Sequence, residues 1–247
     1  MLKLTDLTES FAPEAVPSFP CPLCGSSLSL LPKGLTWGRS AESTSLLKFV
    51  YDPDHDVGFF VLRLECSSGN CRESVACIGK YHCSLGFGSS AQLVVDKALD
   101  PLFFYPTVPI FQIPADVPAE IAEQLRQSFS LFWSNPNAAA NSLRVAVEAM
   151  MDFRHVRKTT VNANGKRVHL TLHSRIVEFK NSKADLGEKL MAIKWLGNSG
   201  SHLTGISKKR LYDGYRLVHY VIEEMFEDKK RNLDKLAKTI IRRKGRA

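Results

Sequence analysis

All six cysteines of this chain lie between Cys21 and Cys83, within roughly the first third of its 247 residues. Two of them open the segment Cys21-Pro22-Leu23-Cys24-Gly25, and two more enclose the segment Cys66-Ser-Ser-Gly-Asn-Cys71. Two short-spaced pairs of thiolates supply the four soft ligands that Zn²⁺ binds in a tetrahedron. The sequence therefore predicts a zinc site formed by Cys21, Cys24, Cys66 and Cys71.

The second cysteine pair leaves other ligand sets open, because its gap is wider than the usual two residues. Cys77 is an alternative member of that pair, and His82 and Cys83 are further candidates. The competing interpretation is a set of buried or free cysteines. Four protein ligands leave no open position for water, so the predicted role of the metal is structural.

The bulk composition indicates a globular protein of the cytoplasm. Hydrophobic residues make up 44% of the chain, charged residues make up 23%, and no run of eighteen apolar residues occurs, so no membrane span is expected. The first twenty residues include acidic side chains and lack a long apolar run, so no secretory signal is expected. In a reducing compartment, paired cysteines favour a metal over disulfides.

The cysteine-containing part of the sequence has the texture of β-structure. The runs 46–51 and 57–64 are apolar and partly alternating, and the polar segment 52–56 joins them, which predicts a β-hairpin that leads to Cys66. A further strand is expected at 73–79. Residues 1–100 are therefore interpreted as a small β-rich, zinc-ribbon-like module.

Residues 101–118 are predicted to connect two modules. The segment contains five prolines and several aromatic residues, PLFFYPTVPIFQIPADVP. Proline in the interior of a helix removes a hydrogen bond and causes a clash, so the segment is expected to be extended and packed.

Residues 119–228 are predicted to form an all-α bundle of helices, because apolar residues recur there at helical spacing. The fourth helix is expected to end at Gly197. A polar break from Thr159 to Arg167, centred on Asn164-Gly165, predicts a short hairpin or loop. The overall class is then α+β, with a β-rich front module and a helical body.

The C-terminal segment, residues 229–247, is strongly basic. From Glu227 to Ala247 there are nine Lys/Arg and three Asp/Glu, so this stretch contributes +6 to a net charge of +8. The segment is interpreted as an amphipathic helix whose cations are either solvated or in contact with phosphate. The candidate nucleic-acid contacts are Lys229, Lys230, Arg231, Lys235, Lys238, Arg242, Arg243 and Lys244.

A second candidate site is the polar segment 194–202, called here the polar corner. It can gather Lys194, Asn198 and His202, a set of side chains suited to binding or cleaving a phosphodiester. The alternative is a helix C-cap at Gly197 followed by a turn. One helical turn separates Arg144 from Glu148, so they are expected to form an ion pair or, if they face the corner, to orient it.

These residues carry a resemblance to a known family. The patterns Leu143-Arg144-x-x-x-Glu148 and Gly197-Asn198-x-x-x-His202 resemble an uncharacterised bacterial domain family found in restriction-type subunits and near phage-defence genes. That family is similar to the HEPN superfamily of helical bundles. The resemblance covers about residues 113–226, and it implies a HEPN-like bundle that forms homodimers and has a zinc-ribbon-like companion.

The resemblance is weaker in its catalytic motif. Active HEPN ribonucleases are metal-independent and often use the pattern Arg-Asn-x-x-x-His. Asn198 and His202 match this pattern, but Gly197 stands in the place of the arginine. The main cation that would stabilise the scissile phosphate is then missing, and Lys194 would offer a point charge in place of a bidentate fork.

The function predicted from the sequence is that of a non-catalytic accessory or regulatory protein of bacterial restriction or phage-defence systems. It would associate with RNA or DNA, or with a partner subunit. One alternative is a metal-independent endoribonuclease with His202 as acid and base, Asn198 as positioner and Lys194 or Arg144 as the cation. Another is a scaffold subunit that docks through the aromatic residues between Phe103 and Phe111.

Overall fold

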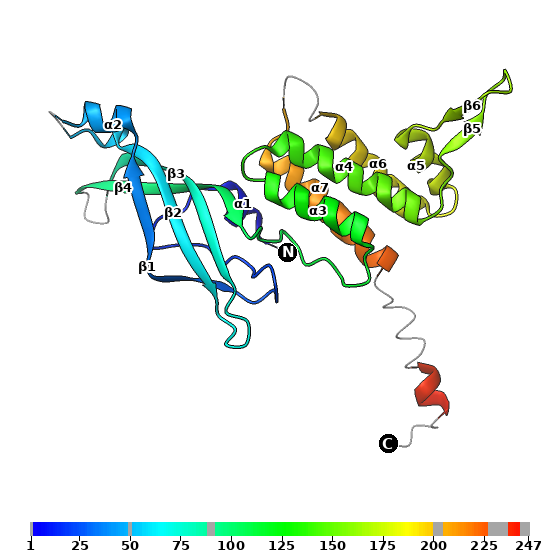
Figure 1. Cartoon of the computed structure of the whole chain (residues 1–247), viewed down its shortest axis with the longest axis horizontal. Coiled ribbons are helices and arrows are strands. Elements are labelled where there is room, and N and C mark those ends of the chain that lie inside the picture. Colours follow the sequence, from blue (N-terminus) through cyan, green and yellow to red (C-terminus); the bar gives the residue numbers. More distant parts are fainter. Residues whose placement is uncertain (1, 49–50, 88–91, 200–204, 227–236, 243–247) are drawn as a thin grey trace.

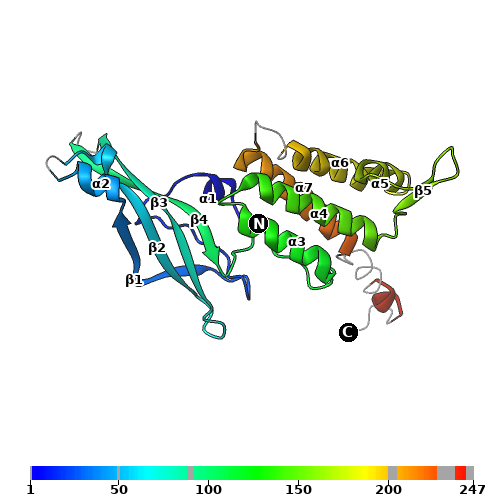
Figure 2. The same cartoon turned by 45° about the horizontal axis from the view of Figure 1, so that its top comes forward.

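The protein has an N-terminal sheet and a C-terminal group of helices that lie end to end (Figure 1). The computed structural model describes residues 2–48, 51–87, 92–199, 205–226 and 237–242. The short helix α1 (Leu4–Thr8) lies between the two parts, as Figures 1 and 2 both show. The α+β class predicted from the sequence is confirmed.

The N-terminal sheet has four antiparallel strands in the order β1-β2-β3-β4. They are β1 (Leu28–Arg39), β2 (Val57–Cys66), β3 (Ser74–Phe87) and β4 (Leu93–Tyr105). Alternate residues of β2, from Phe60 to Cys66, are buried on one face, which is the pattern of a half-covered sheet. Because Phe104 lies opposite Cys77 and is buried, β4 extends to Tyr105, into the segment interpreted as the connector.

The hairpin predicted from residues 46–51 and 57–64 is absent from the described residues. Residues 41–46 form helix α2 (Ala41–Leu46), because the Ser40 hydroxyl caps it by accepting the N–H of Ser43. A 3-10 turn, η1 (Pro53–His55), then leads into β2, which pairs with β1 and β3.

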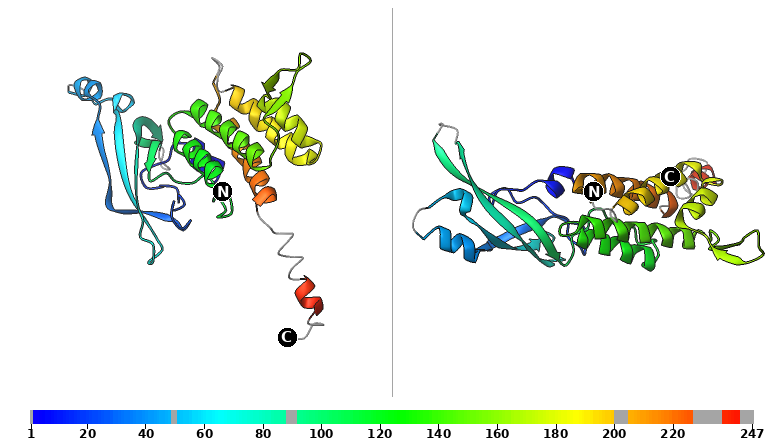
Figure 3. Two further views of the ribbon diagram at one scale, coloured as in Figure 1. Left: turned by 45° about the vertical axis from the view of Figure 1, so that its right-hand side comes forward. Right: turned by 90° about the horizontal axis from the view of Figure 1, so that it is seen from above.

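The N-terminal segment covers the buried face of the sheet and joins it to the helices. Phe11 bridges to Leu99 of β4, and the ring of Phe19 lies 4.8 Å from that of Phe104. Trp133, which follows α3, lies 6.0 Å from Phe19 and 5.0 Å from Phe104. Tyr212 of α7 donates to the carbonyl of Leu2 at 2.9 Å, and Figure 3 shows α1 beside α7. One continuous core therefore spans both parts.

Five helices form the body of the C-terminal part, and a separate helical stretch follows at 237–242. The five are α3 (Ala119–Leu131), α4 (Pro136–Phe153), α5 (Leu172–Lys180), α6 (Ala184–Ser199) and α7 (Lys208–Phe226). Each coincides closely with a run of apolar residues at helical spacing. None of the helices in the described ranges combines the length and apolarity needed to cross a lipid bilayer.

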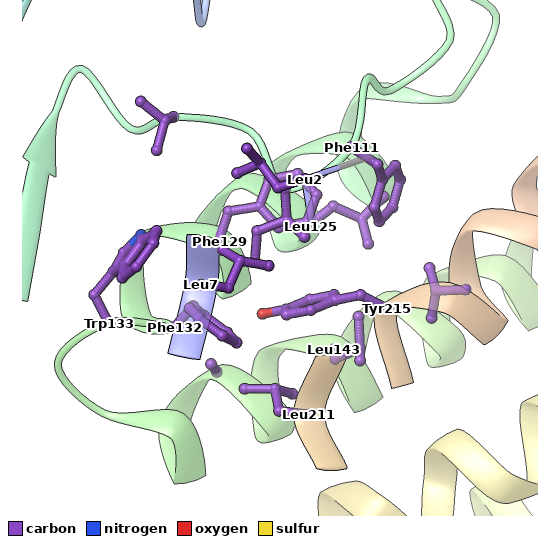
Figure 4. Packing of buried hydrophobic residues seen from close by; sticks show 14 of the residues in the cluster. Leu2, Leu7, Phe111, Leu125, Phe129, Phe132, Trp133, Leu143, Leu211 and Tyr215 are labelled. Carbon is purple, nitrogen blue, oxygen red and sulfur yellow. The ribbon is translucent and has the colours of Figure 1, made fainter. Parts of the chain in front are cut away.

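A buried tyrosine organises the packing of α3, α4 and α7. In Figure 4 the ring of Tyr215 lies among apolar side chains with its hydroxyl toward Phe132. That hydroxyl donates to the Ser128 carbonyl at 3.0 Å, while the Ser128 hydroxyl donates to the Ala139 carbonyl at 2.7 Å. The hydroxyls of Tyr215 and Ser128 are thus both hydrogen-bonded, as burial requires.

The prediction of an all-α bundle for residues 119–228 is wrong. Strands β5 (Thr159–Val161) and β6 (Arg167–His169) form a two-stranded antiparallel sheet between α4 and α5. The hairpin points away from the helices (Figure 1). It forms because Thr159, Thr160 and Val161 are β-branched and Gly165 adopts a φ of 73°, which favours a turn.

One buried carboxylate stabilises the end of the N-terminal sheet at which β1 ends and β2 begins. Asp56 is 3% exposed and accepts two hydrogen bonds from Arg39, each of 2.9 Å, and one from the Tyr81 hydroxyl at 3.0 Å. The hydrogen bonds from Arg39 hold the pKa of Asp56 below its ordinary value, against the opposing effect of burial. This group joins β1, β3 and the turn that precedes β2.

We predict that Asp56→Asn lowers the free energy of unfolding by about 1–3 kcal/mol at neutral pH, because it weakens charge-assisted hydrogen bonds at a buried site. The lowered pKa means that the ionised carboxylate stabilises the fold above its unfolded pKa of about 3.9, and that this contribution is lost as the pH falls. Thermal unfolding of wild type and variant should therefore differ most at pH 6–7 and converge in acid. The exposed Asp54→Asn is the control, and an equal loss in both variants would contradict the prediction.

Candidate metal centre

The sheet register brings the two cysteine pairs together. Leu28, at the start of β1, lies opposite Cys66, at the end of β2. The turn with Cys21 and Cys24 precedes β1 directly, and the turn with Cys71 follows β2. A backbone hydrogen bond of 2.9 Å from Ser67 to the Ser27 carbonyl holds these turns side by side.

The four predicted ligands form a compact cluster. The Sγ atoms of Cys21, Cys24, Cys66 and Cys71 all lie within 4.8 Å of one another. The Cys21–Cys71 separation is 3.7 Å and the Cys24–Cys66 separation is 3.4 Å, both far too long for a disulfide. Sulfur atoms bound tetrahedrally to one ion at about 2.3 Å would lie about 3.8 Å apart. The cluster can therefore hold a metal ion.

Each turn has the geometry of a tight knuckle. In the first, Cys21 N–H donates to the Ser26 carbonyl, Gly25 N–H donates back to the Cys21 carbonyl, and Gly25 has a φ of 77°. The Leu23 N–H also points at the Cys21 sulfur, at 3.4 Å. In the second turn the residue with positive φ is Arg72, at 50°, and Gly69 takes no such conformation.

The thiols of the cluster do not ionise equally without a cation. Hydrogen bonds from Ser26 lower the pKa of Cys24 to about 6. Burial raises the pKa of Cys66, and the thiols of Cys24 and Cys21 add to the rise. A backbone hydrogen bond from Glu73 acts to lower the pKa of Cys71, but burial and the other thiols raise it to about 12. A divalent ion would lower the pKa of all four thiols, because metal binding stabilises every thiolate.

The alternative ligands lie elsewhere in the sheet. Cys77 is fully buried opposite Leu62 and Phe104, and burial raises the pKa of its thiol. Cys83 is buried farther along β3, and His82 faces Asp100 with an Nδ1–Oδ2 distance of 3.3 Å. Among the described residues, none of these three joins the group of four sulfurs.

The polar corner is only partly described. The prediction that this helix ends at Gly197 is wrong, because α6 continues to Ser199. A Cβ atom on Gly197 would lie 2.8 Å from Cβ of Arg144 and 3.1 Å from the Ala140 carbonyl. Glycine at this position therefore permits the close approach of α6 to α4.

The candidate catalytic residues are placed as follows. Lys194 is 9% exposed, and its Nζ lies 3.4 Å from the ring centroid of Trp195. Arg144 pairs with Glu148 at 2.8 Å, as expected for residues one turn apart. The side chain of Asn198 and the whole of His202 lie outside the described residues. The structure thus places two of the four, Lys194 on α6 and Arg144 on α4.

Most of the predicted nucleic-acid contacts also lie outside the described residues. Lys238 and Arg242 belong to a helical stretch at 237–242, where both are exposed. The others are Lys229, Lys230, Arg231, Lys235, Arg243 and Lys244.

A second basic region was overlooked in the sequence. Residues 154–170, called here the arm, include the β5–β6 hairpin and contain five Lys/Arg and no Asp/Glu. The excess of Lys and Arg over Asp and Glu in this stretch could have indicated it. The stretch was instead interpreted only as a polar break between helices.

A comparison with protein-family models gave two matches. Residues 126–243 match a domain of unknown function (DUF4145), and residues 9–107 match another domain of unknown function (DUF8608). The first match covers most of the helical part and the second covers the sheet with its cysteine cluster. Neither curated proteins nor solved structures gave a match to this chain.

We predict that the purified, reduced protein retains about one metal ion per chain, and that Cys21→Ser loses it. The variant removes a buried ligand, so the melting temperature of the N-terminal part should also fall. Elemental analysis and thermal unfolding measure the two effects. Cys83→Ser is the matched control, because it replaces a buried cysteine outside the cluster and should leave the metal content unchanged. Reduced wild-type protein that folds fully without any metal would refute the assignment.

Proposed function

We propose that this protein is a nucleic-acid-associated accessory protein whose cysteine cluster holds a structural Zn²⁺ ion. The observation that carries the proposal is the separation of charge along the chain. Residues 227–247 contribute +6, with nine Lys/Arg against three Asp/Glu, and the other 226 residues contribute only +2, with 24 against 22. A concentrated run of cations matches the polyanionic backbone of nucleic acid.

The described part of this basic segment supports a role in binding. Residues 237–242 are helical, and Lys238, Ile240, Ile241 and Arg242 are all exposed there. A basic helix outside the core stabilises the fold little, so its cations are free to contact a partner.

Zinc is the metal that best fits the cluster. Four cysteine thiolates form the ligand set of structural zinc sites, and the separations of 3.4 and 3.7 Å suit a small tetrahedral ion. Such an ion would fix the turn before β1 against the turn after β2. With all four positions filled by protein it would supply rigidity and no catalysis.

The proposed setting comes from the resemblance in residues 143–202. It implies an accessory or regulatory role in a bacterial restriction or phage-defence system, and association into homodimers or with a partner subunit. The glycine at position 197 supports a non-catalytic role, since it stands where the nuclease motif has arginine.

We predict that deleting residues 229–247 weakens binding to nucleic acid at least tenfold at about 0.1 M salt and flattens its salt dependence, because each lost phosphate contact removes about 0.9 from the log–log slope. Fluorescence anisotropy with a labelled duplex across a salt series measures both quantities. Replacing Lys238 and Arg242 by Gln should reproduce part of the loss, whereas Ile240→Ser with Ile241→Ser should not. Unchanged affinity and slope in the truncated protein would remove the tail from the proposal.

A second candidate function is metal-independent cleavage of RNA with His202 as acid and base. The observation that favours it is the position of Arg144, whose side chain runs against Gly197 from the neighbouring helix. An arginine supplied by α4 would stand in for the missing one. Its pairing with Glu148 offsets that charge, so the non-catalytic role is preferred.

We predict that the protein does not cleave RNA in the presence of a chelator, because the polar corner lacks its own arginine. Gel analysis of labelled RNA incubated with wild type and with His202→Ala measures this. Cleavage that persists in chelator and disappears in the His202 variant would establish the second candidate function in place of the first.

A further inference from the structure

The arm, residues 154–170, contains five cationic residues and no acidic residue. Its cations are Arg154, Arg157, Lys158, Lys166 and Arg167, with His155 and His169 beside them. Figures 1 and 2 show the β5–β6 hairpin projecting beyond the end of the helices. Lys166, Arg167 and His169 are exposed.

The tip of the arm has a defined shape. Thr159 pairs with His169 and Val161 pairs with Arg167 across the two strands. The Asn162 side-chain oxygen accepts the N–H groups of Asn164 and Lys166, both at 3.0 Å, and Gly165 completes the turn with a φ of 73°. The turn therefore presents Lys166 and Arg167 from a closed ribbon.

At the base of the arm, the nearby carboxylates are already engaged in ion pairs. Asp152 accepts Nη2 of Arg175 at 2.6 Å and Nζ of Lys158 at 2.8 Å. Arg175 is 7% exposed and also donates to the Val156 carbonyl at 3.0 Å, which anchors the root of the arm. Arg157 pairs with Glu178 at 2.7 Å.

Within the part of the chain that the structure describes, the cations that remain at the tip have no acidic partner. Among the described residues, neither Lys166 nor Arg167 forms an ion pair with a carboxylate. A protein ribbon that repels other cations and lies far from the core gains nothing for folding from these charges. These charges are therefore available to an anionic partner outside the chain.

We propose that the arm binds double-stranded DNA by entering its major groove. That groove is about 12 Å wide and admits a two-stranded β-ribbon, whose strands lie about 4.8 Å apart. Lys166 and Arg167 offer the donors that recognise guanine or phosphate, and Asn164 at the tip offers an amide. Val161 is 64% exposed on the Arg167 face and presents an apolar surface to a thymine methyl group.

The composition of the arm favours a DNA duplex over other nucleic acids. Proteins that hold single strands stack bases on aromatic rings, and residues 154–170 contain no Phe, Tyr or Trp. The major groove of an RNA duplex is too deep and narrow for side chains to read. The B-form duplex is the polyanion whose groove matches the ribbon in width.

This inference rests on the proposed association with nucleic acid, but it assigns the contact to residues other than the basic C-terminal segment. The experiment uses the full chain and compares Lys166→Glu/Arg167→Glu with Lys209→Glu/Arg210→Glu. The control pair has the same residue types in the same order and is exposed at the start of α7. A third variant, Lys166→Gln/Arg167→Gln, removes charge without reversing it.

Fluorescence anisotropy with a 25-base-pair DNA duplex should show a dissociation constant at least tenfold larger for the Glu variant of the arm than for the wild type. The Gln variant should lower the salt slope by about 2, that is, by about 0.9 for each lost contact. The control should change the affinity less than about twofold. Methyl green, which occupies the major groove, should compete with the protein, whereas netropsin in the minor groove should not.

Several outcomes would overturn the inference. These are an equal loss in the control pair, equal affinity for single-stranded DNA or an RNA duplex, or competition by netropsin alone. Loss of binding on deleting residues 229–247, with the arm variants unaffected, would overturn it and leave the proposed function standing. Failure of the wild-type protein to bind any nucleic acid would overturn both. Unchanged thermal unfolding of the arm variants excludes misfolding as the cause of a loss.

Discussion

The contact of Phe19 with Phe104 and Trp133 holds the two parts of the protein in one core. Phe19 is fully buried two residues before the first cysteine, Phe104 belongs to β4, and Trp133 follows α3. The edge-to-face packing of these rings gives directional contacts in addition to apolar burial. Because Phe19 is held in this way, and its carbonyl accepts the Leu28 N–H at 2.7 Å, the first cysteine turn has a fixed exit toward β1.

The cysteine cluster and the sheet then depend on each other. The register of Leu28 opposite Cys66 brings the sulfurs within 4.8 Å, and a bound ion would hold that register in turn. A one-residue slip of β1 would turn its inward side chains to the other face and separate the turns. A bound ion would thus fix the end of the sheet that lies nearest the helices, while Asp56 with Arg39 fixes the opposite end.

Local chemistry explains what the sequence could and could not predict. The cysteine pairs and the five helices were found because ligand spacing and helical periodicity are both short-range signals. Strand β1, one of the two partners of β2, was not predicted, because it lies in an earlier, weakly alternating segment with a register shift between Leu30 and Leu35. Gly197 reads as a helix end in sequence, and only the packing of α6 against Arg144 reveals it as a close contact within a helix.

The net charge of +8 is distributed unevenly along the chain. Residues 154–170 contribute +5 and residues 227–247 contribute +6, so the remaining residues, with 19 Lys/Arg and 22 Asp/Glu, carry −3. A polyanion is therefore attracted to these two segments and weakly repelled by the rest of the surface, which orients it before any contact forms. The cation excess of the arm also explains why it stands apart from the helices. Among the described residues, the carboxylates that pair with the arm are Asp152 and Glu178, both at its base, so folding the tip back would bury Lys166 and Arg167 without partners.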